Sequence, residues 1–240
     1  TAFSRTKRNS NDFMRYFWVQ SAIKHFEVID NPYDYNREEL IKLIPKIRPY
    51  TRDIKYGLLK VIRALYAVGV TVIYQPTVDR LQVRGATISV NEKPCVVISN
   101  LNNNYPTIWF TLLHELHHVL FDFEEIEKRV YHITSQEGDV FLMNEEKADS
   151  FAKQYLLNDT RYKFVRGYIT SEFHVDRYAK EWGLHPSIIY AIHCFETNEW
   201  AFYNKFIPKM DSALELLNTH PFEQESLIES AKKIKEIISI

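Results

Sequence analysis

Apolar residues recur every three or four positions in three segments before residue 69, which is the spacing of amphipathic helices. The first segment is rich in aromatic residues and ends before an Asp-Asn-Pro turn. Pro45 is expected to end the second helix, and Gly69 is expected to cap the end of the third. The pattern therefore predicts helices at residues 11–28, 37–44 and 51–67.

After Gly69 the pattern changes to short runs of β-branched residues, which favour strands. Three such runs, at residues 70–74, 86–90 and 95–99, are predicted to be strands. The four residues Asn91-Glu92-Lys93-Pro94 between the last two runs suit a four-residue hairpin connection. An extended peptide could then pair with an exposed edge of this hairpin sheet.

Helical spacing returns at Thr107, the expected N-cap of a long apolar helix. Helices are predicted at residues 107–123, 144–157, 171–182 and 186–196, with one or two more before the end. The expected fold class is α+β, with a small antiparallel sheet packed against a mainly helical body. The expected parts, within one compact unit, are an N-terminal helical extension (residues 1–67), a core (68–160) and a C-terminal helical subdomain (161–240).

Composition and charge narrow the function classes. The chain has 240 residues, of which 45% are hydrophobic and 14% aromatic, and this is enough for one large core. Its net charge is -1, so the chain does not have the excess of basic residues that nucleic-acid binders carry over their surface. Residues 37–63 contain eight lysines and arginines, which we interpret as a solvated helical face. Direct nucleic-acid binding is therefore not expected.

The two cysteines, Cys95 and Cys194, are too few for the disulfide framework of a secreted domain. The longest apolar runs are much shorter than a membrane span, and the N-terminal residues are polar, unlike a signal peptide. We therefore expect a soluble protein of the reducing cytoplasm, without a membrane partner.

The sequence His114-Glu115-Leu116-His117-His118 within the long apolar helix carries the clearest chemistry. The helical period places His114 and His118 on one face, one turn apart, so that two imidazoles can bind one metal ion. Glu115 lies next to this face, where a carboxylate can act as general base without being a tight ligand. The pattern is typical of zinc hydrolases.

A second helix offers Glu145 and Asp149 at positions i and i+4. Glu145 is the predicted third zinc ligand, in preference to Glu146, and Asp149 is predicted to orient a ligating histidine through its other ring nitrogen. The alternative is a charged stripe on two surface helices. Apolar residues on nearly every side of the HExxH segment argue against this alternative, because buried ionisable groups need partners or a metal.

These motifs resemble the ImmA/IrrE family of metallopeptidases. The resemblance covers residues 64–159 and rests on residues 110–118 (FTLLHELHH), the strand at 95–99, and residues 145–152 (EEKADSFA) followed by Leu156-Leu157. It implies a gluzincin-like core, a zinc ion, and cleavage of a helix-turn-helix repressor in a stress response or in mobile-element control. Zinc would be held by His114, His118 and Glu145, with Glu115 as the catalytic base.

Two positions depart from the pattern of the family. His117 stands where the family usually has glycine, so a third imidazole lies beside the site, where it could pack, form a hydrogen bond or alter metal affinity. Asn158-Asp159 replaces a Met-Pro pair, which is expected to change only the end of that helix. Neither departure removes a catalytic group.

Some roles stay open from the sequence. The donor that would stabilise the oxyanion has six candidates, His132, His174, His185, His193, Tyr131 and Tyr155. Residues 171–195 are similar to a helix-turn-helix, but the apolar second helix favours an αα-hairpin that supports the site. The alternative function is a regulatory or ligand-sensing module that cleaves nothing and whose DNA-binding domain lies outside this chain.

Overall fold

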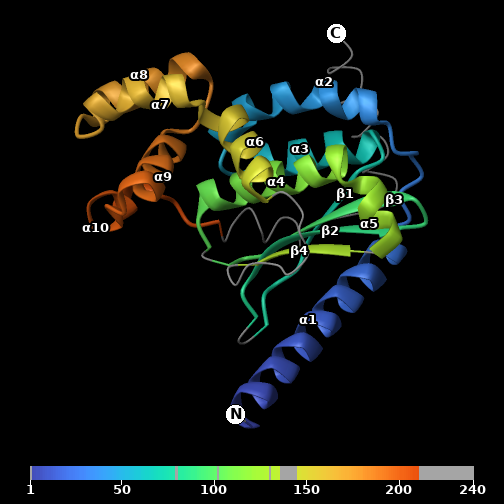
Figure 1. Cartoon of the computed structure of the whole chain (residues 1–240). Helices are drawn as coiled ribbons and strands as arrows, with labels where there is room; N and C mark the ends of the chain where they lie inside the picture. The colour runs from blue at the N-terminus through green and yellow to red at the C-terminus, as the bar shows by residue number, and fades with distance from the viewer. Residues whose placement is uncertain (1, 79–80, 102, 130, 136–144, 211–240) are drawn as a thin grey trace.

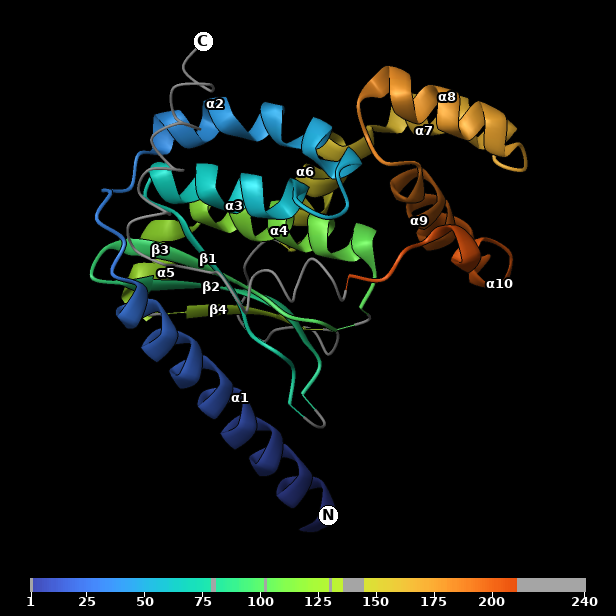
Figure 2. The ribbon, with the colours of Figure 1, turned by 180° about the vertical axis from the view of Figure 1, so that it is seen from behind.

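A mixed β-sheet divides the helices into two layers in the computed structural model, which describes residues 2–78, 81–101, 103–129, 131–135 and 145–210. The strands are β1 (Thr71–Tyr74), β2 (Val83–Val90), β3 (Lys93–Ile98) and β4 (Tyr131–Ser135). The helices α3 (Gly57–Ala67) and α4 (Tyr105–Phe121) cover one face of the sheet, and α2 (Arg37–Ile47) and α6 (Glu145–Leu157) pack onto these two helices (Figure 1). On the opposite side lies α1 (Ala2–Ile29), whose N-terminal part projects away from the body (Figure 2). The predicted α+β class is confirmed.

The strand order in the described residues is β1-β3-β2-β4. The predicted hairpin is confirmed, because β2 and β3 pair antiparallel from Gly85 opposite Ile98 to Val90 opposite Lys93. The predicted four-residue connection is wrong, since Lys93 and Pro94 belong to β3 and only Asn91 and Glu92 form the turn. The prediction of a purely antiparallel sheet is wrong, since β1 runs parallel to β3. Strand β4, which the sequence analysis missed, pairs antiparallel with β2. In the described residues β1 and β4 therefore form the edges of the sheet, and an extended peptide would have to pair with one of these two strands rather than with the hairpin itself.

The side chains on the two faces of the sheet belong to two apolar cores, because side chains alternate along each strand. Val96 and Ile98 of β3 point into the core beneath α2, α3 and α4, whereas Cys95 and Val97 point to the opposite side. On that opposite side α1 buries an apolar face that includes Trp18, whose Nε1 donates a hydrogen bond to the Pro76 carbonyl. The larger core runs continuously from α2 to the C-terminal helices.

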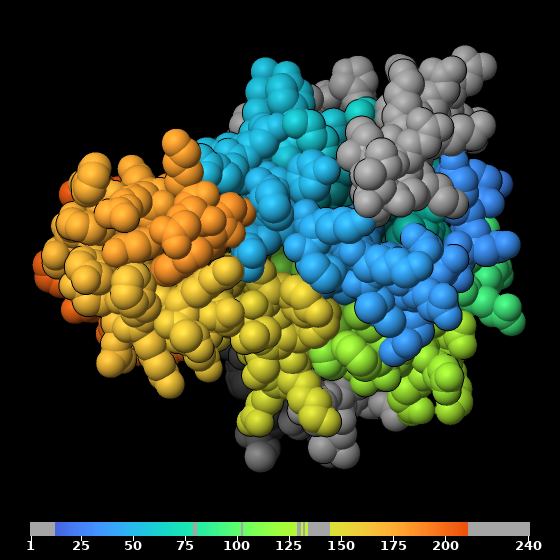
Figure 3. All heavy atoms as spheres, turned by 90° about the horizontal axis from the view of Figure 1, so that it is seen from above, coloured from blue at the N-terminus to red at the C-terminus, as the bar shows by residue number. Residues whose placement is uncertain are grey.

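The C-terminal helices are α7 (Asp159–Val165), α8 (Glu172–Trp182), α9 (Pro186–Thr197) and α10 (Trp200–Tyr203). Gly183, with φ of 67°, forms the left-handed turn that ends α8, and α9 buries Ile188 and Ile189 in the larger core. This packing agrees with the predicted αα-hairpin. Seen from above, α7 and α8 form one end of the molecule beside residues 48–52 (Figure 3), where the Arg52 guanidinium donates to the Lys180 carbonyl.

Several predicted boundaries are wrong, each for a local reason. Pro45 lies inside α2, which continues to Ile47 because Ile44 and Ile47 are buried. The predicted helix at 51–67 is a 3-10 turn (Arg48–Arg52) followed by α3, which begins only at Gly57, where a Cβ would come within 2.0 Å of the Tyr50 carbonyl oxygen. The sequence predicts a single helix here because apolar residues have helical spacing in both elements.

The predicted helix at 107–123 has a different start and end. Asn104, not Thr107, is its N-cap, and the Asn104 side chain accepts a hydrogen bond of 2.9 Å from the Thr107 backbone N–H. Helix α4 ends at Phe121, and a separate helix, α5 (Phe123–Arg129), follows Asp122. Of the one or two helices expected after residue 196, the described residues contain the short α10 (Trp200–Tyr203), and Asn144 and residues 211–240 lie outside the described part.

The basic segment 37–63 supplies contacts within the fold. The Arg37 guanidinium donates to the Leu120 carbonyl at the end of α4, and Lys42 and Lys60 form ion pairs with Glu39 and Asp53. These contacts agree with the interpretation of the segment as a solvated helical face. Within the described residues, no helix combines the length and the apolar character that a membrane span requires.

Candidate metal centre

Three predicted ligands converge between α4 and α6. The Nε2 atoms of His114 and His118 lie 3.2 Å apart, as expected for residues one turn apart on α4. The Glu145 carboxylate, from the first turn of α6, places Oε2 at 3.2 Å from His114 Nε2 and Oε1 at 3.3 Å from His118 Nε2. Glu146, its neighbour, is exposed. The structure thus brings together His114, His118 and Glu145.

The other ring nitrogen of each histidine is held by a carboxylate. Asp149 Oδ1 lies 2.8 Å from His114 Nδ1, and Asp122 Oδ2 lies 2.8 Å from His118 Nδ1. A carboxylate only accepts, so each Nδ1 carries the proton and donates it. Asp149 was predicted for this position, whereas Asp122 was missed. The signal for Asp122 was its own i+4 spacing from His118, just past the last residue of α4.

This arrangement fits a zinc ion. When both Nδ1 atoms donate, a neutral ring presents only a lone pair at Nε2, and the Glu145 oxygens that face these lone pairs also only accept. Acceptors packed this closely need a shared cation or additional protons. Ligands 2.0–2.1 Å from a tetrahedral zinc lie about 3.3–3.4 Å from one another. The observed separations of 3.2 and 3.3 Å agree with this value.

The pKa values of His114 and His118 also show that this site stabilises positive charge. Burial lowers the pKa of His114, but the hydrogen bonds that its ring donates to Asp149 and Glu145 and the charge of Glu115 outweigh burial and raise that pKa to about 10. Burial also lowers the pKa of His118, but the hydrogen bonds that its ring donates to Asp122 and Glu145 raise that pKa to about 9. The surrounding carboxylates therefore stabilise positive charge at this point, whether it is carried by protons or by a metal ion.

Glu115 is fully buried beside the three groups, and its two oxygens differ. Thr87 of β2 donates a hydrogen bond of 2.8 Å to Glu115 Oε2. Glu115 Oε1 has no hydrogen-bond partner among the described residues. Gly85, two positions before Thr87 on the same face of β2, leaves the space at this oxygen, since a Cβ there would lie 2.6 Å from Oε1. One oxygen is thus anchored and the other is available for chemistry.

Thr87 and Gly85 were not predicted as site residues. They are separated from Glu115 by 28 and 30 positions in the chain, and only the packing of α4 on β2 brings them to it. The sequence signal for these two residues was the alternation of side chains along a strand, which places Gly85 and Thr87 on the same face of β2.

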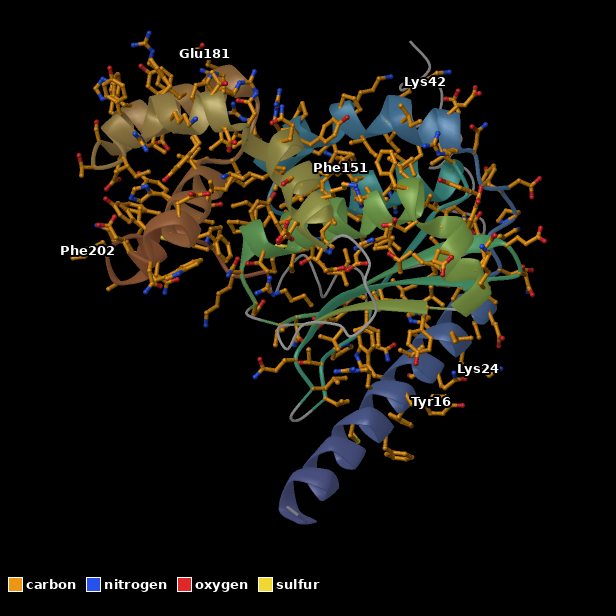
Figure 4. The ribbon with its side chains drawn as sticks, in the orientation of Figure 1. Tyr16, Lys24, Lys42, Phe151, Glu181 and Phe202 are labelled. Carbon is orange, nitrogen blue, oxygen red and sulfur yellow. The ribbon has the colours of Figure 1, made fainter. Side chains whose placement is uncertain are left out.

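His117, the third imidazole of the motif, packs among aromatic rings. Its ring centroid lies 4.8 Å from that of Phe121 and 5.5 Å from that of Phe151, which is labelled on α6 in Figure 4. Burial, followed by the charge of His118, lowers the pKa of His117 to about 4. Of the roles left open for His117, the structure favours packing as a neutral ring.

No protein-family model matches the chain, and no curated protein matches it significantly. The site is therefore interpreted from its own geometry.

Most candidates for the oxyanion donor have other roles. His185 caps α9, His174 stacks on Tyr168, and His193 lies between Tyr162 and Glu199. Tyr155 packs on Phe151, and Tyr131 packs against the core beside α1. The side chain of His132 is outside the described part of the chain. The structure assigns none of the five candidates with described side chains to the candidate metal centre.

Proposed function

We propose that this chain is a zinc-dependent endopeptidase with a gluzincin-like core of the ImmA/IrrE type. The observation that carries the proposal is the convergence of His114, His118 and Glu145 beside the buried Glu115, whose Oε1 has no hydrogen-bond partner among the described residues. A carboxylate oxygen placed next to three potential metal ligands is suited to act as a base on a water molecule bound there.

In the proposed reaction, His114, His118 and Glu145 would hold the zinc ion, and Asp149 and Asp122 fix the orientation of the two imidazoles. A zinc ion bound there would supply a Lewis acid that polarises the peptide carbonyl and lowers the pKa of water. Glu115 would take a proton from water through Oε1 as the water oxygen bonds to the carbonyl carbon, and would return it to the amine nitrogen as the C–N bond breaks. Thr87 holds Oε2 of Glu115, which leaves Oε1 for the proton in both steps.

The proposed substrate is a helix-turn-helix transcriptional repressor in the cytoplasm. This part rests on the family resemblance of the motifs. A peptidase in the cytoplasm has to be restricted by recognition outside the scissile bond, and the helices before Ala67 and after Thr160 are available for that recognition.

The test compares wild type with Glu115→Gln, which preserves shape and removes the base. Both zinc-loaded proteins are incubated with repressors encoded near the gene, and fragments are mapped by mass spectrometry. We expect cleavage at one or few sites by wild type and at least about a 100-fold lower rate for the variant, with unchanged zinc content. Equal cleavage by both proteins would identify a contaminating protease. No cleavage of any partner would favour the ligand-sensing module.

A further inference from the structure

A cluster of aromatic rings extends over α7 and α8, at the end of the molecule that these two helices form in Figure 3. Residues four apart share a face of a helix, so positions 174, 178 and 182 lie together on α8, and positions 164 and 168 lie together on α7 and the turn after it. Neighbouring ring centroids are 5.0–6.5 Å apart. We call these rings the aromatic surface, which consists of Phe164, Tyr168, His174, Tyr178 and Trp182.

Part of the aromatic surface faces solvent. Phe164 is 51% exposed and Tyr168 is 39% exposed, whereas Tyr178 and Trp182 are half-buried and pack against the larger core. Exposed rings that contact one another form a contiguous apolar patch, and such patches mark interaction sites more often than single exposed side chains do. Aromatic rings also contribute strongly to binding at protein interfaces. The aromatic surface thus has a packed base and an exposed rim that a partner can cover.

Three arginines border the aromatic surface. The Arg161 guanidinium lies over the Trp182 ring, 5.6 Å from its centroid, and the Arg177 guanidinium lies 5.9 Å from the centroid of Tyr178. Arg48 follows α2 in the chain, and burial and the charge of the nearby Arg161 both lower the pKa of Arg48. The buried Nε of Arg48 has no hydrogen-bond partner among the described residues. Positive charge therefore accumulates beside the rings.

Carboxylates do not balance this charge in the part of the chain that the structure describes. None of the three arginines forms an ion pair there, and Asp159 at the start of α7 pairs with Lys153 instead. Glu172 and Asp176 of α8 lie near Tyr190 of α9, and burial, followed by these two charges, raises the pKa of Tyr190 to about 12. A partner that brings carboxylates to the arginines would complement the charge of this end of the molecule.

The stacking of the rings favours a protein partner over a nucleic acid. Tyr178 stacks on Trp182 and Tyr168 stacks on His174, with interplanar angles of 18° and 27°. Arg161 also lies over the Trp182 ring. These ring faces are not free for bases, whereas proteins that bind single strands stack bases on open ring faces. The net charge of -1 of the whole chain points in the same direction.

We propose that the aromatic surface and its three arginines bind a segment of a protein partner in which carboxylates flank large apolar side chains. The apolar side chains cover Phe164 and Tyr168, and a carboxylate pairs with Arg48 and Arg161, where it supplies the acceptor that Arg48 Nε lacks. That this partner is the substrate rests on the proposed peptidase function. The surface then binds the substrate through α7 and α8, outside the scissile bond, which lowers KM without changing the chemical step.

Binding is tested first, independently of cleavage, with a synthetic hexapeptide in which leucine and phenylalanine stand between two glutamates on each side. Two control peptides carry glutamines in place of the glutamates, or alanines in place of leucine and phenylalanine. The intact chain is titrated with each peptide, and the side-chain N–H signals of its arginines are followed by NMR. We expect saturable shifts for Arg48 and Arg161 with the first peptide and at least about tenfold weaker binding of both controls.

Equal binding of the three peptides, or no binding, would overturn the inference. A hexathymidylate serves as the nucleic-acid probe in the same titration. Tighter binding of this oligonucleotide than of the glutamate peptide would also overturn the inference, because the partner would then be a nucleic acid.

Two pairs of variants locate the binding. Arg161→Gln and Lys205→Gln each remove a cation that lies over an aromatic ring, but only Arg161 borders the aromatic surface. Phe164→Ala and Phe202→Ala each remove an exposed ring, and Phe202 belongs to α10 (Figure 4). We expect at least about tenfold weaker binding of the glutamate peptide for the first member of each pair and no change for the second. Equal losses within a pair, in variants that circular dichroism shows to be folded, would exclude the aromatic surface as the binding site.

Cleavage then separates this inference from the proposed function. On a repressor that wild type cleaves, Arg161→Gln and Phe164→Ala should raise KM at least about fivefold with kcat unchanged, and both should cleave a short peptide that spans the scissile bond as wild type does. An unchanged KM, or an equal loss on the repressor and on the short peptide, would overturn the substrate role of the surface and leave the peptidase standing. Binding of the glutamate peptide without cleavage of any repressor would overturn the peptidase, and the surface would then bind an acidic partner that is not cleaved.

Discussion

At the scale of single residues, the two carboxylates that hold the histidine rings, Asp122 and Asp149, are the most direct targets for mutation. Asp122→Asn and Asp149→Asn keep the size of the side chain but lose the charge that fixes the Nδ1 proton of His118 and His114. Such outer partners typically contribute about 10–100-fold to metal affinity. We expect each variant to bind zinc more weakly by that factor, measured by competition with a chromophoric chelator.

Asp159→Asn is the matched control, because Asp159 is exposed and pairs with Lys153, away from the metal centre. It should bind zinc like wild type. Zinc affinities that are the same for all three variants and wild type would mean that the carboxylates do not orient the ligands.

The candidate site was predictable from sequence wherever its geometry is local. The i and i+4 spacing brings His114 to His118 on one helix, and the same spacing pairs Glu145 with Asp149 on another. That Glu145 faces both histidines, rather than a solvent surface, depends on how α4 packs on α6. Thr87 reaches Glu115 across 28 positions of the chain, and no periodicity within a single element encodes such a contact.

At the scale of elements, the fit of α4 on β2 depends on one glycine. A Cβ at Gly85 would lie 2.6 Å from Glu115 Oε1 and 2.7 Å from Thr111 Cγ2. Gly85→Ala should therefore overpack this contact and lower the free energy of unfolding by about 1–3 kcal/mol, measured by urea denaturation. Gly167→Ala is the control, since nothing lies within 4 Å of the added carbon, and its effect should stay within about 0.5 kcal/mol. Equal stability of both variants would show that α4 can move away from the sheet at no cost.

The start of α9 should make the fold sensitive to acid. His185 is its N-cap, and Nδ1 accepts a hydrogen bond from the Ser187 backbone N–H, which requires the neutral ring. Burial lowers the pKa of His185 below 6.5, opposed by Asp176 and reinforced by Arg52. As the pH falls below 6.5, the unfolded chain takes up a proton that the folded chain resists, so stability decreases.

His185→Asn keeps a good N-cap acceptor and removes this titration. We expect the loss of unfolding free energy between pH 7 and about pH 5 to be smaller in the variant than in wild type, measured by urea denaturation at each pH. An identical pH dependence in the two proteins would exclude His185 as a contributor.

Element types were predictable where an apolar period extends over several turns, as in α4 and α9. Boundaries were less predictable because they depend on single contacts. Asn104 caps α4 through the Thr107 N–H, and α3 starts where Gly57 fits against Tyr50. Strand β4 has only five residues, and it is stabilised by pairing with β2 rather than by its own pattern. The parallel pairing of β1 with β3 was likewise not predictable, because it depends on how the chain connects these two strands rather than on the pattern within either strand.

At the scale of the whole molecule, the candidate metal centre lies where two parts of the larger core meet. His114 and His118 belong to α4, which packs on the sheet, whereas Glu145 belongs to α6, which leads into the C-terminal helices. A metal ion bound by all three residues therefore links α6 to α4. The carboxylates around His114 and His118 raise the pKa values of both rings, so without a metal ion they favour protons on these histidines.

Zinc should consequently stabilise the folded chain as a whole. A ligand that binds only the folded state at 100 times its dissociation constant stabilises it by about 2.7 kcal/mol. We expect a higher thermal unfolding midpoint for the zinc-loaded protein than for the chelator-treated protein, measured by circular dichroism. Glu145→Gln should lose most of this increase and Glu146→Gln should keep it, because only the Glu145 carboxylate lies against both histidines. If Glu146→Gln loses the increase and Glu145→Gln keeps it, Glu146 is the third ligand. If the wild-type midpoint is the same with and without zinc, the site does not bind zinc.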